Sequence, residues 1–281
     1  MFHKLRSLSA ELPVYLRANP VGVPNRDILE GAMVLKNAAH VQPVGRTNRD
    51  GKPLSNKILL IIPQNEYLSV RSELKSTDLP RHLTLHEPNE KPHFVYFPDG
   101  GVLSLIVVTE DGRTVEAGIV GKEGIVGLGS ALGLKRHPLR AVVQIAGEGS
   151  KIAVDVLRRA LQSAPQLQMA ISRYAVLHGL QVSQTAACNR LHDTGQRLAR
   201  WLLMTQDRVD SGLLRISHDF LATMLGTDRP SVSLAASKMK KKKLIEYARG
   251  SVRILNREKL EGVSCECYDV VQRFNSELGL K

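Results

Sequence analysis

Hydrophobic residues change their spacing twice along the chain. Between residues 56 and 79, in NKILLIIPQNEYLSVRSELKSTDL, they recur every three or four positions, the spacing of a helix. From about residue 80 the hydrophobic runs become short and turn residues separate them, as in HFVYFPDGG, VLSLIVVTE and TVEAGIVG. The Asp111-Gly112 pair between the last two runs is a strong hairpin signal. Up to about residue 153 the pattern predicts short antiparallel strands that form a jelly-roll-like β-roll.

Helical spacing returns at about residue 155 and persists. DVLRRALQSAP predicts a short helix with Asp155 as its N-cap, and QLQMAISRYAVLHGLQVSQTAACNRLH predicts a helix roughly 40 Å long. A helix of that length beside a small domain usually needs a partner helix, so we expect a parallel homodimer here. Asp193 and Gln196 have the spacing of a capping box, which predicts the start of a further helix.

Residues 215–256 predict two helices joined by a tight turn and followed by a β-hairpin. Ser217 and Asp228 are the expected N-caps. Pro230 is tolerated in the first turn of the second helix, because its missing N–H has no intrahelical partner there. The hairpin LIEYARGSVRILN turns at Gly250. This succession is typical of a winged helix-turn-helix.

Three small or apolar residues have structural roles in that motif. Ala222 lets the two helices cross closely, and Gly226 ends the first helix with a positive φ angle. Val232 points into the core between the helices. Met239 follows Val232 by seven residues on the same helical face, so it should also be buried. The lysine run 238–243 around it therefore closes the second helix and is not a tail.

Basic charge is concentrated at the two ends of the chain. The formal net charge is +12, and residues 211–260 carry 11 Lys and Arg against 4 Asp and Glu. Residues 1–60 carry 9 against 4, whereas residues 61–210 are nearly balanced, with 17 against 15. Such a distribution indicates an anionic partner, and beside a helix-turn-helix that partner is double-stranded DNA.

The remaining bulk features argue against several classes of protein. No run of about 18 apolar residues is present, so we expect neither a membrane span nor a membrane partner. Cys188, Cys265 and Cys267 are too few for a disulfide framework, and C-x-C is not the spacing of a zinc knuckle. We interpret them as inactive thiols in a reducing cytoplasm and expect no bound metal.

The order of β-roll, long helix and winged helix resembles the Crp/Fnr family of bacterial transcription regulators. The resemblance covers about residues 56–275 and is closest in HFVYFPDGGVLSLIVVTEDGRTVEAGIVGKEGIVG, QTAACNRLHDTGQRLARWLL and CECYDVV. It implies a symmetric dimer whose second helix, starting at Asp228, enters the DNA major groove at each half of a palindromic site. It also implies RNA polymerase as a protein partner.

The resemblance implies a set of DNA-contacting residues. Arg229 matches the family's guanine-reading arginine, so Arg229, Ser231 and Ser233 are expected to contact bases. Phosphate contacts are expected from the flanks of the motif, at Ser217, Lys240, Lys241, Arg249 and Arg253. The chain departs from the cyclic-AMP receptor by Pro230 in place of a glutamate and Leu234 in place of an arginine. We therefore predict no target sequence.

The effector pocket of the cyclic-AMP receptor is only partly matched. Gly127 and Gly129 flank a leucine where a ribose-binding glutamate is needed, and Arg140 is followed by alanine in place of serine. On the long helix, Ser183 is kept but Val182 replaces a threonine. We expect a degenerate pocket of Gly127, Gly129, Arg140 and Ser183 that binds no cyclic nucleotide. The N-terminal region holds no cysteine for an iron–sulfur cluster, so no cofactor is expected and the effector stays unidentified.

The expected fold class is α+β, with four segments. These are a loosely ordered extension (1–55), a cyclic-nucleotide-binding-like β-roll (56–168), a dimerisation helix (169–192) and a winged helix-turn-helix domain (193–281).

Two other functions compete with this one. His82, His86 and His93 suggest a cupin-like metal enzyme built on the β-roll, but H-x3-H-x6-H is not the cupin spacing. GKEGIVGLGSALG lacks the GK[ST] ending of a P-loop, and no local catalytic motif occurs, so we expect no enzyme. A non-specific nucleic-acid binder rests on charge alone.

Overall fold

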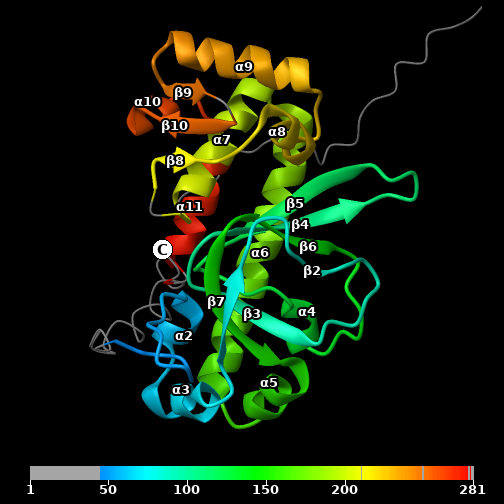
Figure 1. Cartoon of the computed structure of the whole chain (residues 1–281), viewed down its shortest axis with the longest axis vertical. Helices are drawn as coiled ribbons and strands as arrows, with labels where there is room; N and C mark the ends of the chain where they lie inside the picture. Colours follow the sequence, from blue (N-terminus) through cyan, green and yellow to red (C-terminus); the bar gives the residue numbers. More distant parts are fainter. Residues whose placement is uncertain (1–44, 210, 249, 278, 280–281) are drawn as a thin grey trace, which may run out of the picture. The chain divides into compact units, whose positions relative to one another are not determined.

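The computed structural model describes residues 45–209, 211–248, 250–277 and 279 (Figure 1). Most of the predicted N-terminal extension lies outside these residues. Its end differs from the prediction, because residues 45–55 are packed and not loosely ordered. Asn48 is 1% exposed and donates from Nδ2 to Ser150 Oγ at 3.3 Å, and Leu54 belongs to the hydrophobic core.

Two short helices and a strand follow: α2 (Lys57–Ile61), α3 (Gln64–Arg71) and β1 (Lys75–Leu79). Asn56 caps α2 by accepting from Leu59 N. The helical spacing seen in the sequence is thus correct only as far as Arg71. The segment after it is a strand because it pairs along its whole length with a later strand, β7.

The β-roll consists of two antiparallel sheets, with strand orders β1-β7-β3 and β2-β6-β4-β5. Its other strands are β2 (Thr84–His86), β3 (Phe94–Pro98), β4 (Val102–Val108), β5 (Thr114–Val120), β6 (Arg140–Ile145) and β7 (Gly147–Ala153). Asp111 and Gly112 lie in the β4–β5 loop as predicted, and Gly112 has a φ of +81°. That loop is longer than a two-residue turn, since Thr109 N donates to Arg113 O.

Three helices accompany the roll: α4 (Leu128–Ala131), α5 (Val154–Leu161) and α6 (Pro165–Leu191). The N-cap of α5 is Ala153, so the prediction of Asp155 as N-cap is wrong and this residue lies in the first turn. The long helix α6 has 27 residues and begins four positions before the expected boundary, with its proline in the first turn. Its buried residues Leu167, Ile171 and Tyr174 join the core of the roll.

The C-terminal part of the chain is helical with a small sheet of order β8-β10-β9. Its elements are α7 (Thr194–Gln206), β8 (Leu213–Leu214), α8 (His218–Leu225), α9 (Arg229–Lys241), β9 (Ile245–Ala248), β10 (Ser251–Ile254), α10 (Arg257–Glu261) and α11 (Cys267–Glu277). The capping box of Asp193 and Gln196 is present in full at the start of α7. The predicted succession of helix, turn, helix and wing is confirmed.

A second hydrophobic core joins the roll to the C-terminal helices. Ile106 and Ile119 of the roll lie in the same cluster as Trp201 of α7. Trp201 Nε1 donates to Glu116 Oε1 at 2.8 Å, and the Ser104 hydroxyl donates to the other oxygen of that carboxylate. Burial raises the pKa of Glu116 from 4.5 to about 7, although these two hydrogen bonds oppose the shift. A buried carboxyl group therefore lies at the contact between the two parts.

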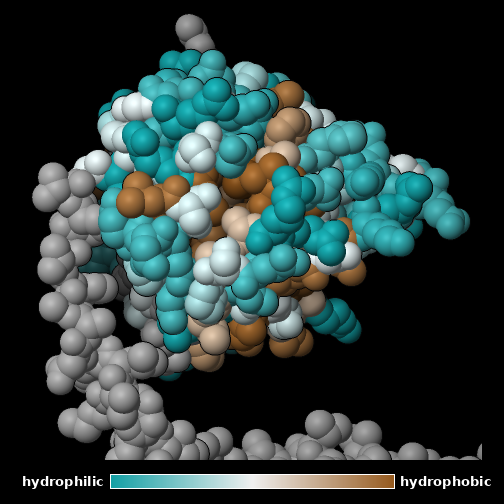
Figure 2. Space-filling view, turned by 90° about the horizontal axis from the view of Figure 1, so that it is seen from below, coloured by the Kyte–Doolittle hydropathy of each residue, from teal (hydrophilic) through white to brown (hydrophobic). Residues whose placement is uncertain are grey.

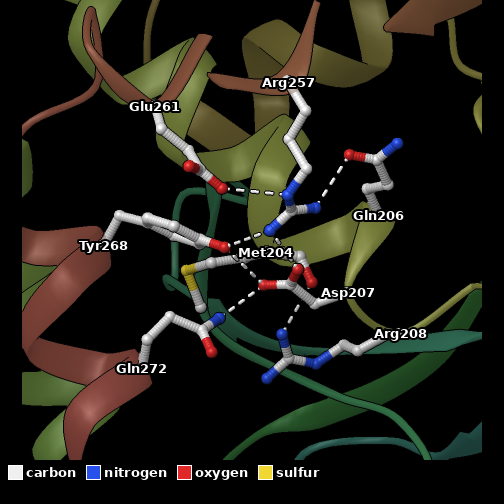
Figure 3. Close-up of polar contacts among 8 residues, drawn as sticks. All are labelled: Met204, Gln206, Asp207, Arg208, Arg257, Glu261, Tyr268 and Gln272. Atoms are coloured by element: carbon white, nitrogen blue, oxygen red, sulfur yellow. Dashed lines mark hydrogen bonds and ion pairs between the residues drawn. The ribbon is translucent and has the colours of Figure 1, made fainter. Parts of the chain in front are cut away.

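A polar network fastens α10 and α11 to the end of α7 (Figure 3). Arg257 Nη2 pairs with Asp207 Oδ1 at 2.7 Å, and Arg257 Nε pairs with Glu261 Oε1 at 2.9 Å. Tyr268 Oη donates to Asp207 Oδ2 at 3.0 Å, and Gln272 Nε2 donates to the same oxygen. Asp207 thus holds both C-terminal helices at one point.

Not all hydrophobic side chains are buried. Figure 2 shows a face on which hydrophobic residues gather between hydrophilic ones. Large hydrophobic residues that are well exposed occur on α2, α3 and α6, among them Ile61, Leu68 and Val176. In the part of the chain that the structure describes, no helix has the length and hydrophobicity needed to cross a bilayer.

Candidate nucleic-acid interface

Side-chain caps fix both helices of the helix-turn-helix. Ser217 Oγ accepts from Phe220 N at 3.2 Å at the start of α8, and Asp228 Oδ1 accepts from Ser231 N at 2.8 Å at the start of α9. Gly226 ends α8 in the left-handed conformation with a φ of +57°. Each predicted cap is confirmed, and together they set where the turn begins and ends.

The crossing of the two helices is buried as predicted. Ala222 is 7% exposed and Val232 is 0% exposed. A small side chain at the first position and a branched one at the second allow α8 and α9 to pack closely. This buried contact sets the position of α9 on α8.

The lysine run forms the end of α9 and the turn after it. Met239 is 5% exposed and packs in the core, which confirms its predicted burial. Lys243 has a φ of +54°, and Leu244 N donates to Met239 O at 3.0 Å. This is the Schellman pattern of a helix C-terminus, with lysine in the position that usually holds glycine. Lys240 and Lys241 are left exposed on the last turn.

One face of α9 is buried in the core, and the opposite face is exposed. Val232, Ala235, Ala236 and Met239 are buried. With 3.6 residues per turn, the opposite ridge carries Pro230, Leu234, Ser237 and Lys241. Leu234 is 59% exposed. The exposed ridge of α9 is thus apolar near the start of the helix and basic at its end.

Arg229 and Ser233 lie on the flank of α9 that faces α8. Arg229 Nε is 3.4 Å from Asp219 Oδ1, and both side chains are about two-thirds exposed (65% and 68%). The Ser233 hydroxyl lies 2.9 Å from Nδ1 of His218, whose ring stacks on Tyr247 of the wing. Partial burial lowers the pKa of His218, and the charge of Arg229 adds to this effect. A neutral His218 therefore joins α8, α9 and the wing.

Ser231 lies on the other flank. Its hydroxyl donates to Asp228 Oδ2 at 2.8 Å, so it is used in the cap of α9. It also lines a cavity of about 480 Å³ between α9 and the start of α7, together with Gln196 and Lys238. The three predicted base-contacting residues are therefore not on one face: Ser231 is separated from Arg229 and Ser233.

The predicted phosphate-contacting residues that the structure describes lie at the start of α8, at the end of α9 and on β10. Lys240 and Lys241 are exposed at the end of α9, and Arg253 is exposed on β10 opposite Glu246 of β9. Ser217 is half-buried at the start of α8. Arg249 lies outside the described residues.

Residues 196–263 match the family model described as the Crp-like helix-turn-helix domain. This region is a Crp-like helix-turn-helix domain. No curated protein sequence matches the chain significantly. The resemblance seen in the sequence is thus confirmed for the DNA-binding domain, and α8 and α9 are its two helices.

Solved structures of Crp/Fnr-type regulators are similar to this chain beyond residues 196–263. FixK2 of Bradyrhizobium japonicum is 16% identical with a TM-score of 0.60, and the match covers 68% of this chain and 98% of that one. The c-di-GMP responsive regulator CLP of Xanthomonas campestris is 17% identical, with a TM-score of 0.58 and coverages of 69% and 100%. A transcriptional regulator of the CRP family from Thermus thermophilus is 21% identical, with a TM-score of 0.56 and coverages of 67% and 96%. The α+β architecture with an N-terminal β-roll is thereby confirmed.

The four residues of the expected effector pocket have different surroundings in the structure. Gly127 is the N-cap of α4 with a φ of +91°, and Gly129 lies one residue inside that helix. Arg140 Nε pairs with Glu87 Oε2 at 2.7 Å. Ser183 Oγ donates to Gly179 O and lines a small cavity beside Phe274 of α11.

The space around Gly129 is filled by a side chain of the protein itself. Ser130 N donates to His137 Nε2 at 3.0 Å, and a Cβ on Gly129 would lie 2.7 Å from His137 Cε1. The imidazole thus accepts a backbone N–H at the start of α4. Burial lowers the pKa of His137, and the neighbouring His86 ring adds to this, so His137 accepts this bond as a neutral ring.

The histidines of the cupin-like alternative are dispersed. His82 and His93 are exposed, whereas His86 is buried with neither ring nitrogen hydrogen-bonded. The one group of three or more metal-binding side chains found among residues 45–209, 211–248, 250–277 and 279 is elsewhere. It consists of Cys188, His192, Cys265 and Cys267. The sequence predicted the three cysteines to be inactive thiols, and it gave no signal for His192.

Proposed function

We propose that the protein is a dimeric, sequence-specific transcription regulator of the Crp/Fnr type that binds a palindromic DNA site and acts with RNA polymerase in the cytoplasm. The observation that carries the proposal is the Crp-like helix-turn-helix, in which α9 presents an exposed ridge with a basic end. Phosphates of DNA are the complementary partner for Lys240, Lys241 and Arg253.

Arg229 is the proposed base-reading residue. Its ion pair with Asp219 joins two exposed side chains, and such pairs contribute little, so the guanidinium can exchange this partner for a base. A guanidinium binds O6 and N7 of guanine with two hydrogen bonds. The apolar Leu234 on the outward ridge fits the methyl group of thymine, which is the apolar feature of the major groove.

An exposed stripe along α6 supports the dimer. Met169, Val176, Leu180 and Leu191 are exposed by 50%, 62%, 37% and 73%, and the first three follow one another at steps of seven and four residues. That is the spacing of a coiled-coil seam. Gly179 has open space around its missing Cβ, so a partner helix can approach closely there. We propose that the stripe packs against the same stripe of a second copy.

The effector of this regulator is proposed to differ from a cyclic nucleotide. The support is local: His137 occupies the start of α4, and Arg140 is paired with Glu87. A thermal-shift screen of nucleotides, haem and small organic acids tests this, and a rise in unfolding temperature with cyclic AMP alone would contradict it.

The DNA proposal is tested by selection of genomic fragments with purified full-length protein. We expect an inverted repeat whose half-sites are separated by about one helical turn, roughly 10 base pairs, or a multiple of it. Binding to the recovered fragment should fall steeply with salt. A fragment with one half-site scrambled is the control. Equal affinity for all duplexes of one length would contradict sequence-specific binding, and a non-palindromic motif would contradict the symmetric dimer.

A further inference from the structure

Four metal-binding side chains meet where α6 ends and α11 begins. Cys188 and His192 are one helical turn apart at the end of α6, and Cys265 and Cys267 flank the start of α11. Their ligand atoms all lie within 4.8 Å of one another. The cysteines are 0%, 3% and 0% exposed, and the His192 side chain is 13% exposed. Folding thus gathers three thiols and one imidazole from segments more than 70 residues apart.

We propose that Cys188, His192, Cys265 and Cys267 bind one divalent metal ion, and that the ion is Zn²⁺. Three sulfurs and one nitrogen form a known donor set of structural zinc sites, in which all four positions are filled by the protein. Zinc in such a site has no open position for substrate. The role that follows is mechanical: the ion ties α11 to α6.

Two of the distances between ligand atoms are close to those of a tetrahedron around zinc. With Zn–S of about 2.3 Å and Zn–N of about 2.0 Å, sulfur atoms of one site are roughly 3.8 Å apart, and sulfur and nitrogen roughly 3.5 Å apart. Cys188 Sγ lies 3.5 Å from Cys265 Sγ, and Cys267 Sγ lies 3.5 Å from His192 Nδ1. These separations need only small side-chain adjustments to admit the ion.

The surroundings of the four ligands match those of a metal site. Nδ1 of His192 faces Cys267, whereas Nε2 lies 3.2 Å from Glu266 Oε1. A carboxylate on the far nitrogen orients a ligating histidine and makes it more basic. Gln184 Nε2 donates to Cys267 Sγ at 3.1 Å, a bond that stabilises a thiolate. His192 and Cys267 therefore each have a polar partner that supports metal binding, Glu266 for the first and Gln184 for the second.

Buried positive charge near the cluster also favours an anionic site. Three thiolates and one Zn²⁺ have a net charge of −1. Arg197 and Arg200 are 8% and 6% exposed, and both lie close enough to Cys188 to interact with it electrostatically. Nε of each guanidinium is buried without a hydrogen-bond partner. A nearby negative centre offsets the cost of burying these cations.

The position of the cluster gives the metal a structural consequence. Asp193, the N-cap of α7, directly follows His192, and Tyr268, which hydrogen-bonds Asp207, directly follows Cys267 (Figure 3). The ion would therefore hold the start of α11 against the end of α6, next to the start of α7. The Asp207 network holds α10 and α11 against the end of α7. Loss of the ion should loosen α11 first.

The test uses full-length protein purified under reducing conditions without chelator from cells supplied with zinc. We expect about one zinc per chain by elemental analysis. After removal of zinc, added Co²⁺ should give the intense visible absorption bands of tetrahedral cobalt with thiolate ligands. Cys265→Ser and Cys267→Ser should lose both signals. Ser276→Ala, an exposed change on the same helix, should keep them.

The wild-type protein alone can overturn the proposal, so it does not depend on the variants being folded. Absence of both zinc and the cobalt bands in folded protein would contradict it. A Cys188–Cys265 disulfide that persists through purification under reducing conditions, or iron together with inorganic sulfide, would also contradict it. The assay contains no DNA, so its failure leaves the proposed regulator function standing.

Discussion

In the proposed complex with DNA, Arg229 and Lys241 of α9 are expected to have two different roles. Arg229 lies at the first turn with a weak exposed partner, and Lys241 lies at the last turn on the outward ridge. Base edges are read by the first turns of a recognition helix, whereas cations at its end meet the backbone. The two residues are therefore a matched pair for separating specificity from affinity.

Arg229→Ala should relax specificity at one base position of each half-site and cost about 1–3 kcal/mol on the cognate site. Lys241→Ala should weaken binding to all duplexes about equally and lower the salt slope by about one. Fluorescence anisotropy with cognate and substituted duplexes at several salt concentrations measures both. An unchanged specificity profile for Arg229→Ala would remove this residue from the base-reading set.

Glu116 makes stability depend on pH in a defined direction. Because burial raises its pKa from 4.5 to about 7, the folded protein holds a proton that the unfolded chain releases between these values. The free energy of unfolding should therefore fall as pH rises from about 4.5 to 7, by on the order of 3 kcal/mol. In Glu116→Gln this slope should disappear. The amide can accept from Trp201 and donate to the Ser104 hydroxyl, so the packing is kept.

Urea unfolding at a series of pH values measures this effect. Glu110→Gln, at an exposed residue of the β4–β5 loop, is the control and should keep the wild-type slope. Glu116→Gln should be more stable than wild type at pH 8 and about equally stable near pH 4.5. A slope that survives in Glu116→Gln would show that another group controls it.

At the scale of elements, α9 and α6 each carry a feature set by local geometry. The end of α9 places a lysine in the left-handed conformation, which costs an L-residue about 1–2 kcal/mol relative to the right-handed region. The outer face of α6 leaves apolar side chains in solvent. The first feature concerns folding stability, and the second concerns assembly.

Lys243→Gly should raise the free energy of unfolding by about 0.5–1 kcal/mol, because glycine adopts a φ of +54° without steric cost but loses more backbone entropy on folding. Lys243→Ala removes the same charge and keeps the Cβ, so it should give no gain. Denaturant unfolding of wild type and of the two variants measures these differences in the free energy of unfolding. Equal stability of both would mean that the left-handed position is not strained.

Val176→Glu tests the proposed seam of α6. A charge at this 62% exposed position should leave the monomer fold intact but repel its counterpart across a symmetric interface. Light scattering should show a monomer where wild type is a dimer, and affinity for the palindromic site should fall while binding to a half-site is kept. Gln168→Glu, at an exposed residue about 100° around the same helix from Met169 and so off the stripe, is the control. A dimeric Val176→Glu protein would point to another interface.

At the scale of the whole molecule, the described chain is joined by contacts that no local pattern contains. Glu116 and Trp201 connect the roll to α7, and Asp207 connects α7 to α10 and α11. The cysteine cluster connects α6 to α11. Each of these contacts joins residues at least 50 positions apart, so its partners become visible only when the chain is folded.

The sequence by itself determined the elements and their caps. Period and turn chemistry act over a few residues, and this is why the capping box at Asp193, the αL position at Gly226 and the burial of Met239 could be predicted correctly. The same local logic failed at Lys75–Leu79, where pairing with β7 overrides helical spacing, and at Asp155, where Ala153 is the N-cap.

Only the tertiary structure decided which side chains meet. It turned the flank of α9 that carries Arg229 and Ser233 toward α8, and it placed His137 against α4. It also brought Cys265 and Cys267, whose C-x-C spacing fits no local zinc motif, to the end of α6 beside Cys188 and His192. A ligand set shared between distant segments leaves no periodic signal, because its spacing depends on how helices pack and not on the spacing along the chain.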